Sequence, residues 1–318
     1  MNAVASLEME KAIRVFESID FEKIIDHPNI LIAANFWDDE RYKAAKSCYK
    51  FMRYIDDFVD NYKSEHKTVP AEKQEIFETH VNNWIQSVVQ PENGEVLFPE
   101  ITDTIRKFHI PMWSMEDFAT AMIYDIYHDG FDSLDAFINY AGGASVAPAS
   151  VFVHLCGLTQ KNGQYLSPEF DVKAAATPCA IFSYLVHIIR DFVKDHTRNL
   201  NYFPLDLMRK YDLNRENLLT MANGGELSPG FRAMIRELYD KAEEYRLETI
   251  KKMAEIKPGL DYNSQLSLEI IFSLYTMVYE RIDLENGLFT TEELNPTSEE
   301  IKSKVFEIIK TFDYDNAH

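Results

Sequence analysis

Two short segments of the chain each carry a pair of aspartates four residues apart. The first segment runs from Arg53 to Asp60 and contains Asp56, and the second contains Asp191 and Asp195. On a helix, residues four apart share one face with Cβ atoms about 5–6 Å apart, so each pair presents two neighbouring carboxylates. Mg²⁺ prefers oxygen ligands such as carboxylates, waters and substrate phosphates. Two such faces opposed across a helical bundle would form a site for Mg²⁺ and a phosphorylated substrate.

Acidic pairs at this spacing can also arise by chance on a solvated helix face, because the chain has 52 acidic and 32 basic residues. Shared features of the two segments favour a functional site. Each has an arginine near its first aspartate, Arg53 or Arg190, and each lies among Ile, Val, Phe and Tyr. An ionised carboxylate in such surroundings is costly unless a cation meets it. Asp57 is a weaker candidate, because it points about 100° away from Asp56 on the helix.

The overall composition restricts the partners of the chain. Its formal net charge of −20 disfavours nucleic acids and anionic membranes, since both attract Lys and Arg. An anionic substrate must therefore be received by metal ions and a few local basic side chains. Cys48, Cys156 and Cys179 lie in apolar stretches without paired spacing, which predicts buried free thiols in a reducing cytosol.

The pattern of apolar residues predicts helices almost throughout. We find no convincing alternating strand pattern and no Asn-Gly hairpin. Prolines, glycines and polar clusters divide the sequence into predicted helices at 8–25, 37–63, 70–90, 97–108, 114–128, 132–156, 168–196, 204–222, 228–255, 262–286 and 297–312. No linker or internal repeat is evident, so residues 1–318 are interpreted as one all-α domain, a large helical bundle.

The sequence also bears on whether the chain enters a membrane or is secreted, and on whether one of its helices is kinked. No signal peptide is evident at the N-terminus, and the longest apolar run, about 174–189, is too short and interrupted to span a bilayer, so a buried helix is expected. In the stretch 140–149, two glycines and a proline predict a kink. Its small side chains would make room for a hydrocarbon beside a cavity, and close helix packing explains them equally well.

A metal and arginine clamp at the mouth of an aromatic-rich cavity suits the ionisation of an allylic diphosphate. Metal ions and arginines stabilise pyrophosphate as it leaves. The remaining carbocation must be kept from water and is stabilised by aromatic faces. The chain supplies 21 Phe and 17 Tyr for such a cavity.

The same segments resemble the squalene/phytoene synthase family. The stretch Phe51–Tyr62 resembles the first aspartate-rich motif of the family, and Tyr184–Pro204 is similar to its second. Phe36–Arg41 looks like the helix start before the first motif, Tyr140 with its glycines like the central small-residue helix, and Tyr275–Arg281 like the C-terminal cavity helix. The resemblance covers most of the chain and is strongest at the two motifs.

This resemblance implies the all-α isoprenoid synthase fold around a central apolar cavity, and dependence on Mg²⁺, or on Mn²⁺ in its place. It implies head-to-head condensation of two prenyl diphosphates of the farnesyl or geranylgeranyl class by a cytoplasmic enzyme that meets membranes only through its lipid product. The catalytic and metal-binding candidates are Asp56, Asp60, Asp191 and Asp195, with His187 and Asp57 as weaker ones. The diphosphate-binding candidates are Arg53, Arg190, Lys194, Arg198 and Tyr202.

Within the second motif, Tyr184 and His187 stand where the family usually has glutamine and asparagine. The asparagine oxygen is a metal ligand in the family, whereas an imidazole is a poor ligand for Mg²⁺. Three interpretations of His187 remain open: a diphosphate contact, a partner of Asp191 that titrates near neutral pH, or a structural histidine.

Other departures concern a second substrate. The serine-bearing segment that helps the family hold a second prenyl diphosphate is replaced by apolar residues after Asn29, and an expected arginine is Leu200. Two alternatives therefore stay open beside condensation. One is a class I terpene cyclase-type reaction on a single prenyl diphosphate, which the four-residue spacing of His187, Asp191 and Asp195 also suits. The other is a non-catalytic isoprenoid-binding protein on the same fold.

Overall fold

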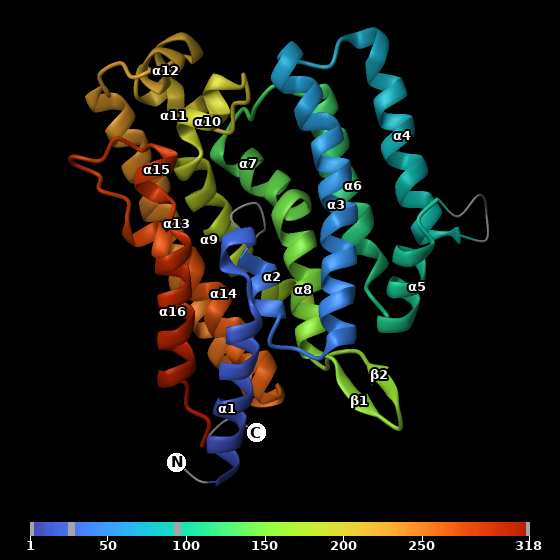
Figure 1. Ribbon diagram of the computed structural model, residues 1–318. Helices are drawn as coiled ribbons and strands as arrows, with labels where there is room; N and C mark the ends of the chain where they lie inside the picture. The colour runs from blue at the N-terminus through green and yellow to red at the C-terminus, as the bar shows by residue number, and fades with distance from the viewer. Residues whose placement is uncertain (1–2, 25–28, 92–96, 316–318) are drawn as a thin grey trace.

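The computed structural model describes residues 3–24, 29–91 and 97–315, and nearly all of its regular structure is helical (Figure 1). The elements, in chain order, are α1 (Ala3–Ser18), η1 (Phe21–Ile24), α2 (Asn29–Ala34), α3 (Asp39–His66), α4 (Ala71–Val89), α5 (Pro99–Phe108), α6 (Met112–Tyr127), α7 (Leu134–Ala141), the π-helix η3 (Gly142–Val146), α8 (Ala147–Gly157), β1 (Thr159–Lys161), β2 (Gln164–Leu166), α9 (Val172–Arg190), α10 (Phe192–Thr197), α11 (Leu205–Lys210), α12 (Arg215–Ala222), α13 (Pro229–Ile256), η4 (Lys257–Gly259), α14 (Tyr262–Glu280), α15 (Thr291–Leu294) and α16 (Ser298–Thr311). The predicted all-α class is confirmed.

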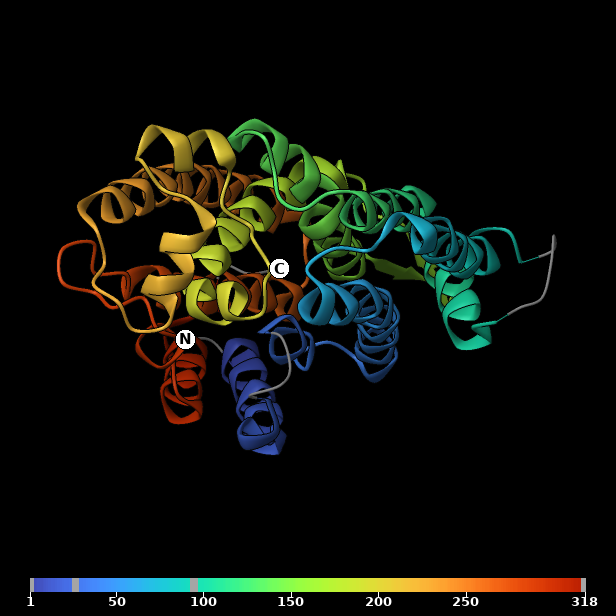
Figure 2. The same ribbon diagram turned by 90° about the horizontal axis from the view of Figure 1, so that it is seen from above.

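Helix α9 is the central element of the bundle. It packs against α13, α8, α14 and η3, while α6 packs against α4 and η3. Seen from above, α1 and α16 lie at one side of the molecule, and α4 lies away from them (Figure 2). Two helical stretches, Leu134–Gly157 and Val172–Arg190, are long and apolar enough to cross a membrane, and 50% and 61% of their most apolar windows are buried inside the protein. The expected buried helix at the longest apolar run is α9.

A buried arginine joins the starts of two cavity helices. Asp38 caps α3 by accepting from the backbone N–H groups of Glu40 and Arg41, and its carboxylate also accepts from Arg41 Nε at 2.6 Å. The same guanidinium reaches Asp261, the N-cap of α14, at 3.1 Å and Ser264 at 3.2 Å. Since Arg41 is only 7% exposed, its loss would leave two charged caps without their partner.

Several predicted helices are divided. The stretch predicted as 132–156 is α7, η3 and α8, with a π-helical turn at Gly142–Val146. A Cβ atom on Gly143 would lie 2.3 Å from the backbone oxygen of Asp117 and 2.7 Å from Ala121 Cβ, so this glycine allows close contact with α6. Helix packing therefore explains Gly143.

The helix predicted at 168–196 is broken at Asp191, between α9 and α10. Hydrogen bonds continue through the break: Asp191 N donates to His187 O at 2.8 Å, and Asp195 N donates to Asp191 O at 2.8 Å. The two aspartates therefore keep the one-turn separation that the sequence predicted. The helix predicted at 204–222 is likewise two helices, α11 and α12, and the short α2 and α15 were not predicted.

The prediction that the chain has no Asn-Gly hairpin is wrong. Strands Thr159–Lys161 and Gln164–Leu166 pair antiparallel, and the connecting Asn162 and Gly163 have φ angles of 52° and 77°. Two consecutive positive φ angles are the signature of the two-residue turn that favours Asn-Gly. Strands of three residues are too short to show an alternating pattern, so only the turn dipeptide carried the signal.

Candidate active site

A cavity of about 630 Å³ lies between α3, the η3–α8 region, α9, α10 and the C-terminal segment from α14 to α16. Ligand pockets typically have about 300–1,000 Å³. Its apolar wall includes Ala45, Cys48, Met52, Phe118, Ala144, Pro148, Val151 and Phe152. Its charged residues are Arg53, Asp56, Asp57, Asp60, Arg190, Asp191, Lys194, Asp195 and Arg198. The structure thus brings the two aspartate segments, about 130 residues apart, to one cavity.

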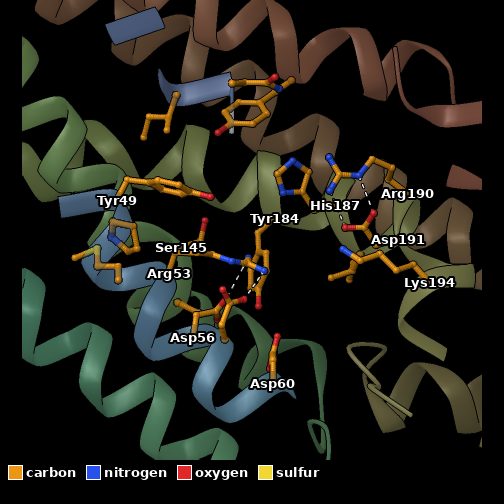
Figure 3. Close-up of a pocket in the computed structure, with 18 of the residues that line it drawn as sticks. Tyr49, Arg53, Asp56, Asp60, Ser145, Tyr184, His187, Arg190, Asp191 and Lys194 are labelled. Atoms are coloured by element: carbon orange, nitrogen blue, oxygen red, sulfur yellow. Dashed lines mark hydrogen bonds and ion pairs between the residues drawn. The ribbon is translucent and has the colours of Figure 1, made fainter. Parts of the chain in front are cut away.

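Helix α3 contributes both to the apolar wall and to the charged residues of the cavity. Its apolar residues Ala45, Cys48 and Met52 are followed along the helix by Asp56 and Asp60. In Figure 3, Asp56 and Asp60 lie on the α3 side, Asp191 and Lys194 lie on the other, and Tyr184 stands between them. The opposed arrangement expected from the sequence is therefore present.

In the first motif, Arg53 binds two carboxylates. Its guanidinium lies 3.1 Å from Asp56 Oδ2 and 2.7 Å from Asp57 Oδ1. The side chain of Asp57 is 42% exposed, compared with 30% for Asp56, so Asp57 is turned further toward solvent. Asp60 accepts a hydrogen bond from the Tyr202 hydroxyl at 3.4 Å.

The surroundings of the first-motif carboxyl groups disfavour their ionised form. Burial, together with the charges of Asp125 and Asp57, raises the pKa of Asp56 to about 6 even though Arg53 opposes the shift. Burial and the neighbouring Asp56 and Asp125 raise the pKa of Asp60 well above its usual value. Both groups would gain from a cation in the cavity.

In the second motif, the pKa values of the two carboxyl groups are shifted in opposite directions. Arg190 donates to Asp191 from Nε at 2.9 Å and from Nη2 at 2.7 Å. Burial alone would raise the pKa of Asp191, but the hydrogen bonds and charge of Arg190 lower it. Burial and the charge of Asp191 raise the pKa of Asp195 to about 7. Within the described residues, no cation lies at ion-pair distance from Asp195 or Asp60.

His187 is a neutral side chain. Burial, followed by the charge of Arg190, lowers the pKa of its imidazole to about 3. The ring lies 5.5 Å from that of Tyr275 at a steep angle to it, and its buried Nε2 has no hydrogen-bond partner among the residues that the structure describes. Of the three interpretations left open for His187, this lowered pKa disfavours a partner of Asp191 that titrates near neutral pH, because burial and the charge of Arg190 outweigh that of Asp191. Arg190, rather than His187, is the partner of that carboxylate.

The segment after the second motif reaches back to the first. Asn199, with φ of 60°, donates its side-chain amide to Ser64 O at 3.2 Å, and Tyr202 binds Asp60. Arg198 and Lys194 face the cavity and have no carboxylate partner within the described part of the chain. The predicted diphosphate contacts therefore fall into three groups. Arg53 and Arg190 are paired with aspartates, Lys194 and Arg198 have no carboxylate partner among the described residues, and Tyr202 is hydrogen-bonded to Asp60.

Sequence reasoning missed a buried cluster beneath the first motif. Lys63, one turn after Asp60, lies 3.2 Å from Asp125 Oδ1, and the Tyr140 hydroxyl donates to Asp125 Oδ2. The signal was the lone acidic residue in the apolar run Ala121-Met-Ile-Tyr-Asp125-Ile-Tyr. An acidic residue in such a run requires a partner.

The donor set fits a hard divalent cation. Carboxylate oxygens are suitable ligands, and Asp56, Asp60 and Asp195 carry raised pKa values that a bound cation would relieve. In residues 3–24, 29–91 and 97–315, no three His, Cys, Asp or Glu side chains are close enough to hold a metal ion by themselves. A metal ion at either pair would therefore need further ligands, such as waters or substrate phosphate oxygens.

Comparison with known proteins gives a consistent result. The sequence matches the squalene/phytoene synthase family over residues 28–296. It is 21% identical over 247 residues to "Phytoene synthase 2, chloroplastic" of Oryza sativa subsp. japonica, covering 77% of this chain and 57% of that protein. A phytoene synthase of Thermus thermophilus is 30% identical over 89 residues, covering 28% of this chain and 29% of the relative. The chain therefore spans about half the length of the rice relative that it matches.

Solved structures share the fold. A dehydrosqualene synthase superposes with a TM-score of 0.65 at 14% identity, covering 96% of this chain and 98% of that one. Squalene synthase HpnC from Alicyclobacillus acidocaldarius gives 0.60 at 13% identity, covering 93% and 98%. YisP from Bacillus subtilis gives 0.60 at 15% identity, covering 94% and 98%. The predicted isoprenoid synthase fold is confirmed.

Proposed function

The chain belongs to the squalene/phytoene synthase family, and we propose that it ionises allylic prenyl diphosphates and condenses two of them head to head. The supporting observation is the pairing of opposed carboxylates and free cations with an apolar wall in one cavity. The charged part suits a diphosphate, and the apolar part suits a farnesyl or geranylgeranyl chain.

Mg²⁺, or Mn²⁺ in its place, would be held by Asp56, Asp60, Asp191 and Asp195. When bound, such ions stabilise the negative charge of the leaving diphosphate. The side chain of Asp57 is turned further toward solvent than that of Asp56, with 42% of it exposed compared with 30%, and the neutral imidazole of His187 is a poor ligand for a hard cation. We therefore place both outside the ligand set.

Lys194 and Arg198 are the side chains best placed to receive the diphosphate, because neither has a carboxylate partner in the described part of the chain. Charged donors bind phosphate oxygens with short, strong hydrogen bonds. Arg53 and Arg190 would also be available to bind the diphosphate if their aspartates held a metal ion. Tyr202 acts through Asp60, whose carboxylate it orients.

The apolar wall protects the cation that remains after ionisation. Ala144 and Ser145, in the π-helical turn, keep the wall close to the backbone, and the Ser145 hydroxyl is turned to Ala180 O at 2.9 Å. π-Helical turns are frequent at functional sites. Small side chains here leave space for hydrocarbon, while aromatic faces elsewhere in the wall stabilise positive charge.

A second candidate is cyclisation or rearrangement of one prenyl diphosphate. The observation that favours it is the number of free cations: within the described residues, only Lys194 and Arg198 line the cavity without a carboxylate partner. Two lone cations suit one diphosphate better than two.

The test is incubation of the full chain with Mg²⁺ and farnesyl or geranylgeranyl diphosphate, with and without a nicotinamide reductant. Pyrophosphate release distinguishes an enzyme from an isoprenoid-binding protein. A product with twice the carbon count of the substrate supports condensation, and a product with the same count supports cyclisation. Binding without pyrophosphate release at any chain length would reject the proposal.

A further inference from the structure

One apolar arm of the cavity runs along α3, away from the first aspartate motif. Ala45, Cys48 and Met52 line this arm on successive turns of the helix. Because a helix rises about 1.5 Å per residue, Ala45 lies about 16 Å along α3 from Asp56. Arg41, one turn further, does not line the cavity. The arm therefore ends between the levels of Ala45 and Arg41.

Phe152, on α8, stands at this end of the arm. The first residues of α3 and the last residues of α8 lie at the same end of the bundle (Figure 1). Phe152 lines the cavity and is 4% exposed. Its ring packs on that of Trp37, with centroids 4.7 Å apart, and Trp37 itself does not line the cavity. The Phe152 ring therefore lies between the cavity and Trp37.

The buried arginine at the start of α3 holds this aromatic pair in place. The guanidinium of Arg41 lies 5.9 Å from the ring centroid of Trp37, a distance at which a cation and an aromatic ring attract each other. It also donates to Ser264 Oγ at 3.2 Å. Cys156, one turn after Phe152 on α8, donates to Ser264 O at 3.4 Å. A longer hydrocarbon would have to displace the aromatic pair and meet a buried guanidinium, which apolar groups cannot solvate.

The length of the arm distinguishes two classes of prenyl chain. When each C–C bond of about 1.5 Å advances an extended chain by about 1.25 Å, a farnesyl chain is about 14 Å long and a geranylgeranyl chain about 19 Å. Counted from the level of Asp56, the farnesyl chain ends before Ala45, and the geranylgeranyl chain passes it. The phenyl ring of Phe152 extends about 4 Å beyond its Cβ atom, which is close to the difference between the two chains.

We propose that Phe152, held by Trp37, closes the apolar arm and restricts it to chains of farnesyl length. The inference rests on the proposed function, because it takes a prenyl diphosphate as the ligand. Phe152 is then a residue that determines specificity, and it acts on the end of the hydrocarbon that is remote from the diphosphate.

The main variant is Phe152→Ala, and the measurement is kcat/KM with farnesyl and with geranylgeranyl diphosphate in the presence of Mg²⁺. We expect the wild type to favour farnesyl diphosphate at least tenfold. Phe152→Ala should lose this preference, because the space that the ring leaves matches the additional length of the longer chain.

Phe118→Ala is the matched control, since it removes the same ring from the wall of the same cavity. Phe118 follows Asp117, whose backbone oxygen lies beside Gly143. It therefore lies at the level of η3 rather than at the end of the arm. This control should affect both substrates alike and keep the preference of the wild type.

Three outcomes would overturn the proposal. One is a wild type that uses both substrates equally, and another is a Phe152→Ala variant that keeps the preference for farnesyl diphosphate. The third is the same loss of preference in Phe118→Ala, since the volume of the cavity rather than its length would then decide. If Phe152→Ala does not fold, Phe152→Leu decides: its smaller side chain should reduce the preference at least threefold, and an unchanged preference would reject the role of the ring.

A binding measurement without turnover separates this inference from the proposed function. Farnesyl and geranylgeranyl thiolodiphosphates, in which sulfur replaces the bridging oxygen, ionise far more slowly than the substrates. With Mg²⁺, the farnesyl analogue should raise the Tm of the wild type more than the geranylgeranyl analogue, and Phe152→Ala should abolish this difference. A difference that persists in the variant refutes the inference even if the wild type releases pyrophosphate. A difference that is lost in the variant, with no pyrophosphate release by the wild type, refutes the proposed function and supports the inference.

Discussion

Replacing Asp195 by asparagine should stabilise the ligand-free protein at alkaline pH. Burial and Asp191 raise the pKa of Asp195 from 3.8 to about 7, and each pKa unit corresponds to about 1.4 kcal/mol. The ionised carboxylate therefore costs the folded state about 4 kcal/mol well above pH 7. Asparagine keeps the shape and removes this cost.

The sign of the pH dependence follows from the raised pKa. Between about pH 4 and 7 the folded wild type holds a proton on Asp195 that the unfolded chain has lost, so its stability rises as the pH falls. Lowering the pH from 8.5 to 5.5 therefore raises the free energy of unfolding of the wild type by about 2 kcal/mol. The asparagine variant lacks this contribution, so its advantage should shrink from about 4 to about 2 kcal/mol.

The measurement is urea denaturation of wild type and Asp195→Asn at pH 8.5 and 5.5, without metal ions or pyrophosphate. The raised pKa of Asp56 and the lowered pKa of His187 affect both proteins and cancel in the difference. The charge of Asp195 also raises the pKa of Asp60, so its removal relieves Asp60 as well and adds to the advantage of the variant at alkaline pH. With Mg²⁺ and pyrophosphate the order should reverse, since only the wild type retains the carboxylate. A variant less stable than wild type at pH 8.5 without ligands would refute an unfavourable environment for the Asp195 carboxylate.

Four further outcomes are expected. Mg²⁺ and pyrophosphate together should raise Tm by more than the sum of their separate effects, because each relieves a charge that the other introduces; a merely additive shift would argue against a shared site. Asp191→Asn should reduce turnover by orders of magnitude and Asp57→Asn much less, since the Asp57 side chain is turned toward solvent and lies outside the proposed ligand set; equal losses in steady-state assays would contradict this order. The neutral imidazole of His187 predicts that the pH–rate profiles of wild type and His187→Asn have the same shape between pH 5 and 8, whatever the change in rate; a limb lost in the variant would oppose it. Arg41→Met should lower the free energy of unfolding by about 1–3 kcal/mol, because both caps lose a charged hydrogen-bond partner while their own carboxylates stay about half exposed, and urea denaturation measures this against Lys50→Met, a change of an exposed lysine.

The sequence alone determined the local geometry of the site. Aspartates four apart on an amphipathic helix must share a face, since this follows from the 3.6-residue helical turn. That spacing survived even the helix break at Asp191, because the hydrogen bonds across the break were kept. The sequence also located most helices, since caps and breaking residues act within a few positions of themselves.

Only the tertiary structure decided the state of each side chain. Asp191 and Asp195 have the same chemistry and share a motif, yet the structure lowers the pKa of one and raises that of the other. The sequence left three interpretations of His187 open, and only the structure shows the burial that lowers the pKa of its imidazole. The pairing of Lys63 with Asp125 spans 62 positions of the chain. Burial and Coulomb interactions depend on distances between helices that are remote in sequence. The spacing of residues along the chain does not give these distances.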